Sequence, residues 1–339
     1  MNKKKTVFSA MQPSGNLTIG NYISVLRHWK GLQKKYKCIF CIADLHSLTS
    51  VTSNKNCSSI KKSILDTLAL YLSCGVDPKK SIIFIQSSIS EHAELNWILS
   101  CYTSYKELMR MTQFKSKILD LKKNINTGLF NYPVLMASDI LLYKTDKVLV
   151  GEDQKQHIEL TRNISMKFNS IYGKTFQVPK ILIFQKGARI MSLLNPKKKM
   201  SKSDSNLKNS IFLLDNPKDI LKKVKSSITD SDFPPKIFFD IDKKPGISNL
   251  LIILSTLNNV SVCDLEKYFL GKSYLELKQE VYNALIKNII QIQEKFFFYR
   301  NNKFLLKEIF YKGSQRASKI AKKTLSNIYK ILGLLKKFE

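Results

Sequence analysis

The sequence predicts an α/β fold, a Rossmann-type doubly wound parallel sheet followed by a C-terminal α-helical domain. In the first half, short apolar runs of strand length alternate with longer segments whose apolar residues recur at spacings of three and four. Strands that are apolar throughout are typical of a parallel sheet covered by helices on both faces. After about residue 207 almost only helical periodicity remains, so the second half is expected to be helical.

The individual elements follow from the same patterns. Strands are predicted at 6–12, 37–45, 81–86 and 147–153. In the first half, helices are predicted around 22–32 and at 54–74, 93–111, 133–143 and 155–172; in the second half they are predicted at 217–227, 248–257, 263–269, about 274–301 and 314–336. These elements suggest three parts: a Rossmann-type sheet domain at 1–196 with a helical insertion at about 93–143, a mobile loop at 197–206, and a helical domain at 207–339. The final helix is a candidate to pack back on the sheet domain.

The net charge of +30 in 339 residues first suggests a nucleic-acid partner, because phosphates attract basic surfaces whatever their sequence. However, only six of the 56 basic residues are arginines, and asparagine and isoleucine are also abundant. Pressure toward adenine- and thymine-rich codons would produce the same profile. The charge alone is therefore weak support for RNA binding.

Cysteine spacing and hydropathy argue against a metal centre and a membrane anchor. Cys38 and Cys41 form a CxxC pair, but no second pair follows at zinc-site spacing, so both are expected to be core thiols of a strand. No protein-bound metal or cluster is expected. The first residues are basic without a long apolar stretch, and no apolar run approaches the roughly 20 residues that span a bilayer. We expect a soluble, cytoplasmic protein with no membrane partner.

Polar residues follow the predicted strands, where ligands of an open parallel sheet bind. The first strand leads into Gln12-Pro13-Ser14-Gly15 and then Thr18-Ile19-Gly20-Asn21, a glycine turn that opens a helix and could hold a phosphate. The second strand leads into Asp44 and His46, and the fourth into Gly151-Glu152-Asp153-Gln154. Ordinary turns and helix caps would also explain each segment taken singly.

Residues 197–206, KKKMSKSDSN, are the most unusual segment of the chain. Fixing one lysine side chain costs roughly 2 kcal/mol of rotamer entropy, so such a loop makes poor scaffold. It suits an anion that binds and leaves, although a solvated linker is the simpler interpretation of a lysine run.

Several motifs together resemble one family. KMSKS at 199–203 is a signature of class I aminoacyl-tRNA synthetases, and Thr18-Ile19-Gly20-Asn21 corresponds to the second signature of that class. With FSxxQPSGxxTIGNY, TQFKSK, MASDILLY, VGEDQKQHIELTR and GARIMSL, the chain resembles the bacterial tryptophanyl-tRNA synthetases from end to end.

The resemblance implies an ATP-dependent ligase, of class EC 6.1.1.2, for protein biosynthesis. Such an enzyme forms tryptophanyl-adenylate and pyrophosphate from L-tryptophan and ATP–Mg²⁺, and then transfers tryptophan to the terminal ribose of tRNA(Trp). It also implies a homodimer, with the metal held mainly by the phosphates. The catalytic residues it implies are Thr18, Asn21, Lys117, Lys199 and Lys202. The ATP-binding residues it implies are Gln12, Pro13, Ser14, Gly20, Asn21, Gly151, Glu152, Asp153, Ile190, Lys199, Met200, Ser201, Lys202 and Ser203.

For the amino acid, the resemblance implies that Asp139 accepts the indole N–H. The other tryptophan-binding residues it implies are Phe8, Gln12, His46, Tyr132, Met136 and Gln154. A carboxylate within an apolar helical segment is costly unless it is paired or functional, which singles out Asp139. Ordinary core packing would equally explain Phe8 and Met136. Ala10 departs from the family, which more often has glycine there.

Two alternatives remain open at this stage. A tyrosyl-tRNA synthetase would share the fold and the chemistry, but its usual signatures differ from VGEDQKQH and MASDILLY. A catalytically silent relative that only binds RNA would agree with the positive charge, although every motif lysine is present.

Overall fold

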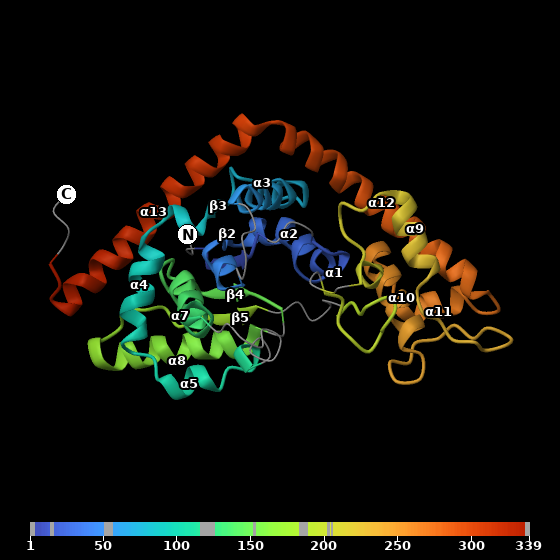
Figure 1. Cartoon of the computed structure of the whole chain (residues 1–339), viewed down its shortest axis with the longest axis horizontal. Coiled ribbons are helices and arrows are strands. Elements are labelled where there is room, and N and C mark those ends of the chain that lie inside the picture. Colours follow the sequence, from blue (N-terminus) through green and yellow to red (C-terminus); the bar gives the residue numbers. More distant parts are fainter. Residues whose placement is uncertain are drawn as a thin grey trace.

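The computed structural model describes residues 4–13, 17–50, 57–115, 126–151, 154–182, 189–201, 204 and 206–335. Figure 1 shows a half built around the sheet and a helical half beside it. Two long helices, α12 (Tyr274–Asn301) and α13 (Lys303–Leu332), meet at Asn302 and form an arch over both halves (Figure 1).

The sheet has five parallel strands in the order β3-β2-β1-β4-β5. They are β1 (Thr6–Met11), β2 (Lys37–Ile42), β3 (Ile82–Ile85), β4 (Lys147–Leu149) and β5 (Lys180–Leu182). This order reverses direction between β1 and β4, as in a doubly wound sheet. The predicted fold class is therefore confirmed. The sequence reasoning missed β5, a strand of three residues that is exposed to half-buried and carries no run of buried apolar side chains.

Alternate residues of the central strands enter two separate apolar cores, one on each face of the sheet. Phe40 and Ile42 join one core and Ile39 and Cys41 the other, because successive side chains of a strand point to opposite faces. Cys41 is fully buried and burial raises the pKa of its thiol, which agrees with the prediction of core thiols. The apolar strands are thus explained by helices on both faces.

The first core is covered by α1 (Ile19–Asn21), η1 (Tyr22–Leu26), α2 (Arg27–Lys35) and α3 (Cys57–Ser73). The second is covered by α4 (Glu91–Ser100), α5 (Tyr105–Met109), α7 (Thr127–Leu141) and α8 (Lys155–Tyr172). The single helix predicted at 93–111 was wrong. It breaks after α4 because Ser104 and Glu107 form a capping box that starts α5. Helix α7 begins six residues before the predicted 133, because the Asn126 side chain accepts the N–H of Leu129.

The helical half consists of α9 (Pro217–Lys225), α10 (Pro245–Asn258), α11 (Val262–Tyr268) and the arch. Helix α13 begins eleven residues before the predicted 314 and lies against the edge strand β3. A Cβ at Gly313 would lie 1.7 Å from the carbonyl oxygen of Ile83, so only glycine permits this contact. Arg316 donates to the carbonyl oxygens of Pro78 and Ser81, at 3.1 and 3.0 Å. The chain's last helix thereby covers an edge that would otherwise be exposed.

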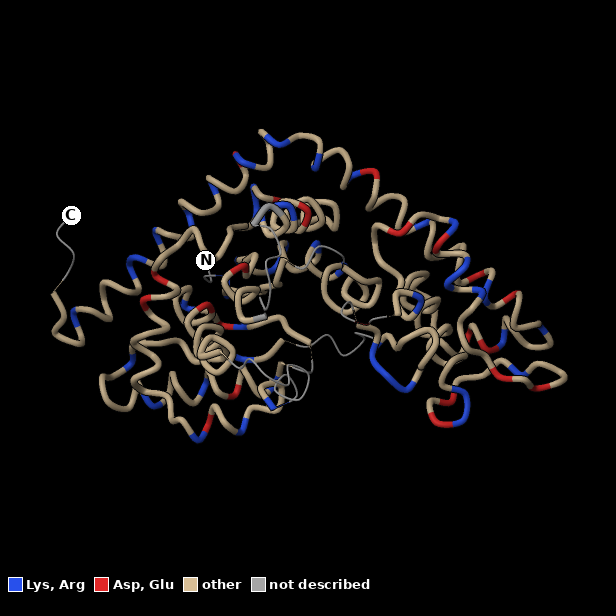
Figure 2. The backbone as a smooth tube through the Cα atoms, viewed as in Figure 1, with Lys and Arg blue, Asp and Glu red and all other residues tan. Residues whose placement is uncertain are grey.

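The distribution of charge and the hydropathy of the helices bear on binding to nucleic acid and to membranes. Figure 2 shows Lys and Arg along the whole arch and over both halves of the molecule, as expected if much of the charge reflects composition. In the part of the chain that the structure describes, no single helix is long and apolar enough to cross a membrane. Only α10 and α11 counted together reach that threshold, and they are bent by 109° at the break between them.

Candidate active site

A cavity opens at the carboxyl ends of β1 and β4, where the strand order reverses. β1 pairs with β4 only from Val7 to Phe8, whereas it pairs with β2 along its whole length. Beyond Phe8 the two strands no longer pair, and the cavity lies between residues 9–12 on one side and Leu149, Val150, Gly151 and Gln154 on the other. Open parallel sheets bind ligands at such a point.

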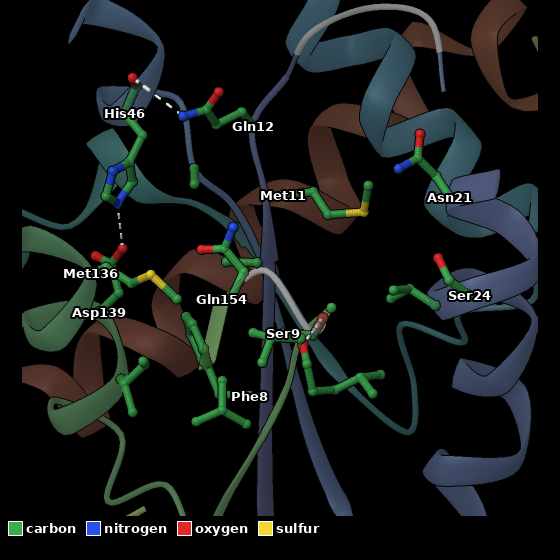
Figure 3. A pocket seen from close by; sticks show the side chains of 18 of the residues that line it. Phe8, Ser9, Met11, Gln12, Asn21, Ser24, His46, Met136, Asp139 and Gln154 are labelled. Atoms are coloured by element: carbon green, nitrogen blue, oxygen red, sulfur yellow. Dashed lines mark hydrogen bonds and ion pairs between the residues drawn. The ribbon is translucent and has the colours of Figure 1, made fainter. Parts of the chain in front are cut away.

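The cavity has a volume of about 380 Å³, within the range of small-molecule sites. Figure 3 shows two groups of side chains around it, one with Phe8, His46, Met136 and Asp139, the other with Asn21 and Ser24. The predicted site residues that line it are Phe8, Gln12, Asn21, His46, Tyr132, Met136, Asp139, Gly151, Gln154 and Lys199. The fold thus brings residues that are up to 191 positions apart in the sequence, Phe8 and Lys199, to one cavity.

Asp139 is the centre of a buried polar network at the closed end of the cavity. It belongs to α7 and its side chain is 2 % exposed. One carboxylate oxygen, Oδ2, lies 2.9 Å from His46 Nε2, while Oδ1 accepts the amide of Gln86 at 2.7 Å and lies 2.6 Å from His92 Nδ1. Three partners therefore satisfy the charge that burial would otherwise make costly.

The same contacts set the ionisation of Asp139. Burial raises the pKa of its carboxyl group, but the hydrogen bonds from His46 and His92 and their electrostatic attraction outweigh burial and lower the pKa to about 2. The carboxylate is therefore ionised at neutral pH. An ionised carboxylate that faces a cavity is an acceptor for an N–H group of a ligand.

This pKa predicts a pH dependence of stability. Because the folded-state pKa lies below the ordinary value of 3.8, Asp139 contributes stability that is complete above about pH 4 and is lost as the pH falls toward 2. Thermal unfolding of the wild type and of Asp139→Asn between pH 2 and 6 measures it. The difference in melting temperature between the two proteins should shrink below pH 4; a constant difference would contradict the assignment.

The sequence reasoning missed three members of this network. They are Gln86, His92 and Tyr143. Gln86 follows β3 directly and also accepts the N–H of Leu45. His92 Nε2 forms a hydrogen bond of 2.8 Å with the hydroxyl of Tyr143. Gln86 and His92 are fully buried. A glutamine at a strand end was the available signal for the first; nothing in the local pattern distinguishes His92 from a core histidine.

The turn Thr18–Asn21 is held by its own side chains. Thr18 Oγ1 accepts the N–H of Asn21 at 3.3 Å, while the N–H and hydroxyl of Thr18 both donate to Asn21 Oδ1 at 3.0 Å. One turn of π-helix follows at η1, a feature that is frequent at functional sites. The catalytic roles of Thr18 and Asn21 stay predictions.

Lys199 reaches the cavity from a hairpin formed by residues 190–200. The N–H of Ser192 donates to Lys198 O at 2.8 Å, and that of Met200 donates to Ile190 O at 3.0 Å. A Cβ added to Gly20 would lie 3.5 Å from Ile190 Cβ and 3.9 Å from Met200 Sδ. Ile190 and Met200 therefore lie against the glycine turn.

The remaining predicted residues divide into two groups. Pro13, Thr18, Gly20, Ile190, Met200 and Ser201 are described but do not line the cavity. Ser14, Lys117, Glu152, Asp153, Lys202 and Ser203 lie outside the described residues. Over the described ranges, no three His, Cys, Asp or Glu side chains are grouped so as to hold a metal ion.

Residues 1–289 match the family model described as "tRNA synthetases class I (W and Y)". The chain belongs to this family. It is 54% identical, over 99% of both chains, to the tryptophan--tRNA ligase of Buchnera aphidicola subsp. Acyrthosiphon pisum (strain APS). The resemblance to tryptophanyl-tRNA synthetases is therefore confirmed over the full length.

Two solved structures support the same conclusion. The tryptophanyl-tRNA synthetase of Mycoplasma pneumoniae superposes with a TM-score of 0.90 at 34% identity, covering 98% of each chain. That of Campylobacter jejuni, a complex with ADP and tryptophan, gives 0.81 at 32% identity over 97% of this chain and 100% of that one.

Proposed function

We propose that this protein is a tryptophan--tRNA ligase that works with ATP. The observation that carries the proposal is its 54% identity, over 99% of both chains, to a protein of that name. The cavity at the switch point, lined by an ionised carboxylate and by Lys199, supports it. The tyrosyl and RNA-binding alternatives have no comparable support.

The reaction has two steps. The carboxylate of tryptophan attacks the α-phosphorus of ATP, a P–O bond forms to the amino acid, and the bond to the departing pyrophosphate breaks. A hydroxyl of the terminal tRNA ribose then attacks the carbonyl carbon, and AMP leaves. Neither step needs a nucleophile from the protein, so positioning of the reactants and placement of cations account for catalysis.

The nucleotide occupies the side of the cavity formed by the glycine turn and the hairpin. Asn21 and Gly151, two residues after the end of β4, line the cavity there. Gly20, Ile190 and Met200 lie against one another beside it and are proposed to contact the nucleotide. Lys199 supplies positive charge, together with Lys117 and Lys202. Mg²⁺ enters with ATP as part of the substrate and is held mainly by the phosphates.

Tryptophan occupies the other side. Phe8, Tyr132 and Met136 pack around the indole ring, and the carboxylate of Asp139 accepts its N–H. Tyr132 is held by a 2.8 Å hydrogen bond to His157 Nε2, and burial raises its pKa to about 12, so its hydroxyl stays neutral. Ala10, which replaces the family's usual glycine, narrows this side by one methyl group. The enzyme is proposed to act in the cytoplasm, where protein synthesis uses its product.

Pyrophosphate exchange tests the function. The purified chain is incubated with ATP, labelled pyrophosphate and one amino acid at a time. Exchange should depend on tryptophan and be at least 100-fold slower with tyrosine, because a phenol places no N–H at Asp139. Exchange with tyrosine alone would favour the tyrosyl alternative. RNA retention on a filter without any exchange would favour the silent relative.

We also predict a homodimer. Trp97 in α4 and Tyr105 in α5 are 73% and 67% exposed, and both lie in the insertion between β3 and β4. Aromatic side chains at a surface are typical of the core of an interface. Light scattering at micromolar concentration should give twice the chain mass, and Trp97→Asp should shift it toward the monomer. A monomeric wild type with full charging activity would contradict the prediction.

The helical half at 207–339 is proposed to bind the anticodon end of tRNA(Trp). Lys218 and Lys222 are exposed on α9, whereas Lys223 is buried and holds Asp215 at 2.7 Å. Lys218→Ala with Lys222→Ala should weaken tRNA charging severalfold, mostly at low salt where the wild-type lysines are least screened, and leave pyrophosphate exchange unchanged. Equal loss of both activities would mean that the two halves do not divide the work.

A further inference from the structure

One side-chain amide of the helical half holds the hairpin that carries Lys199. Asn249 is the fifth residue of α10 and is 2% exposed. Its Oδ1 accepts the N–H of Met191 at 2.8 Å, and its Nδ2 donates to the carbonyl oxygen of Met191 at 2.9 Å. Both backbone groups of one residue are therefore bound by one side chain.

The position of Met191 makes this contact specific. Met191 pairs with Lys199 across the hairpin, and the hairpin's own hydrogen bonds use Ile190 and Ser192 instead. The N–H and carbonyl of Met191 thus point away from the Lys199 side of the hairpin. On that outer side the amide of Asn249 forms hydrogen bonds with both groups, as the backbone of a third strand would. Only a group with a donor and an acceptor at this spacing satisfies both.

The hairpin connects α10 to the nucleotide side of the cavity, so the position of α10 determines the position of Lys199. Lys199 lies directly opposite Met191 and lines the cavity, while Ile190 and Met200 on either side lie against Gly20. A displacement of Met191 therefore displaces the lysine and the surface facing the glycine turn together. The residues around Asp139 are on other elements and do not depend on the hairpin.

A second attachment prevents α10 from sliding along the hairpin. The N–H of Ile228 donates to Leu193 O at 2.9 Å. A Cβ at Gly246 in α10 would lie 2.2 Å from Ile228 O. The first turn of α10 is therefore in direct contact with Ile228, which itself binds the hairpin two residues beyond Met191.

We propose that Asn249 is a positioning residue for ATP use: its amide fixes the hairpin so that Lys199, Ile190 and Met200 meet the nucleotide. The inference rests on the proposed function, because it assigns the hairpin to ATP. Replacing Asn249 should therefore change kcat and the KM for ATP but leave the Kd for tryptophan unchanged, because other elements form the tryptophan side of the cavity.

The test compares Asn249→Asp and Asn249→Ala with the control Ser248→Ala. The aspartate has the same shape but offers Met191 O no donor. Ser248 lies in the same turn, is equally buried, and accepts the N–H of Asp240 at 2.9 Å, away from the hairpin. Pyrophosphate exchange is measured in the full chain at a temperature where melting curves show every variant folded, with tryptophan binding measured separately by calorimetry.

We expect Asn249→Asp to lower kcat for exchange about 100-fold and raise the KM for ATP, because misplacement by about 1 Å can cost that much. Asn249→Ala should change both in the same direction. The Kd for tryptophan should stay within twofold of the wild type in every variant, and Ser248→Ala should alter only the melting temperature.

Two results would overturn the inference. One is unchanged kcat and ATP KM in both Asn249 variants. The other is a parallel loss of ATP and tryptophan parameters, which would make Asn249 a residue that only stabilises the fold. A wild-type chain without exchange activity would instead contradict the proposed function, and the inference with it.

Discussion

Lys199→Ala is expected to lower the turnover of pyrophosphate exchange about 100-fold while raising the Kd for ATP only a few-fold. Negative charge spreads over the α-phosphate and the leaving pyrophosphate as the adenylate forms, so a lysine held at the cavity stabilises the transition state more than bound ATP. Lys202→Ala should behave in the same way. Single-turnover kinetics and ATP binding by equilibrium dialysis measure the two effects separately.

Lys197→Ala provides the matched control. Lys197 belongs to the turn of the same hairpin and is exposed, but it does not line the cavity. Its replacement should leave turnover within twofold of the wild type, which separates a specific contact from a general loss of positive charge. If Lys199→Ala weakened ATP binding and left turnover intact, the hairpin would be a binding clamp without a catalytic role.

The sheet and the location of the site were predictable because they rest on local signals. Four of the five strands are apolar runs bounded by turns, and polar residues follow each of the four. A parallel sheet brings these strand ends to one edge whatever the details of packing. Gln12, His46 and Gln154 follow such strand ends and line one cavity, whereas Phe8, inside β1, was assigned by the family resemblance alone.

The partners of the site residues could not be predicted, since they depend on packing between distant segments. Asp139 was singled out as a carboxylate in an apolar helix, but its contact with His92 requires α4 and α7 to lie side by side, and its contact with Gln86 requires α7 to reach the end of β3. Asn249 offers no local signal either, because an asparagine near the start of a helix is ordinary. Its role depends on a hairpin 58 residues earlier in the chain.

The carboxylate of Asp139 should decide tryptophan affinity. Asp139→Asn keeps the shape of the side chain but replaces one acceptor oxygen with an NH₂ donor. That NH₂ group then faces another donor, either the N–H of the indole or a group of His46, Gln86 or His92. An unsatisfied N–H in a buried site costs about 1–3 kcal/mol, or roughly 5- to 150-fold in affinity. We expect the Kd for tryptophan to rise by that factor and the Kd for ATP to stay unchanged. Asp139→Ala should have the larger effect, with lower stability, because it leaves three partners without their acceptor.

Asp66→Asn is the matched control for this prediction. Asp66 is a largely buried carboxylate of α3 that forms an ion pair with Arg300 in α12, and it does not line the cavity. Its replacement should lower the melting temperature but leave both ligand affinities unchanged, since breaking a buried pair destabilises the fold without touching the site. If Asp139→Asn instead bound tryptophan as tightly as the wild type, another group would have to accept the indole N–H. The network of Asp139 with His46, Gln86 and His92 would then be a structural core that only borders the cavity.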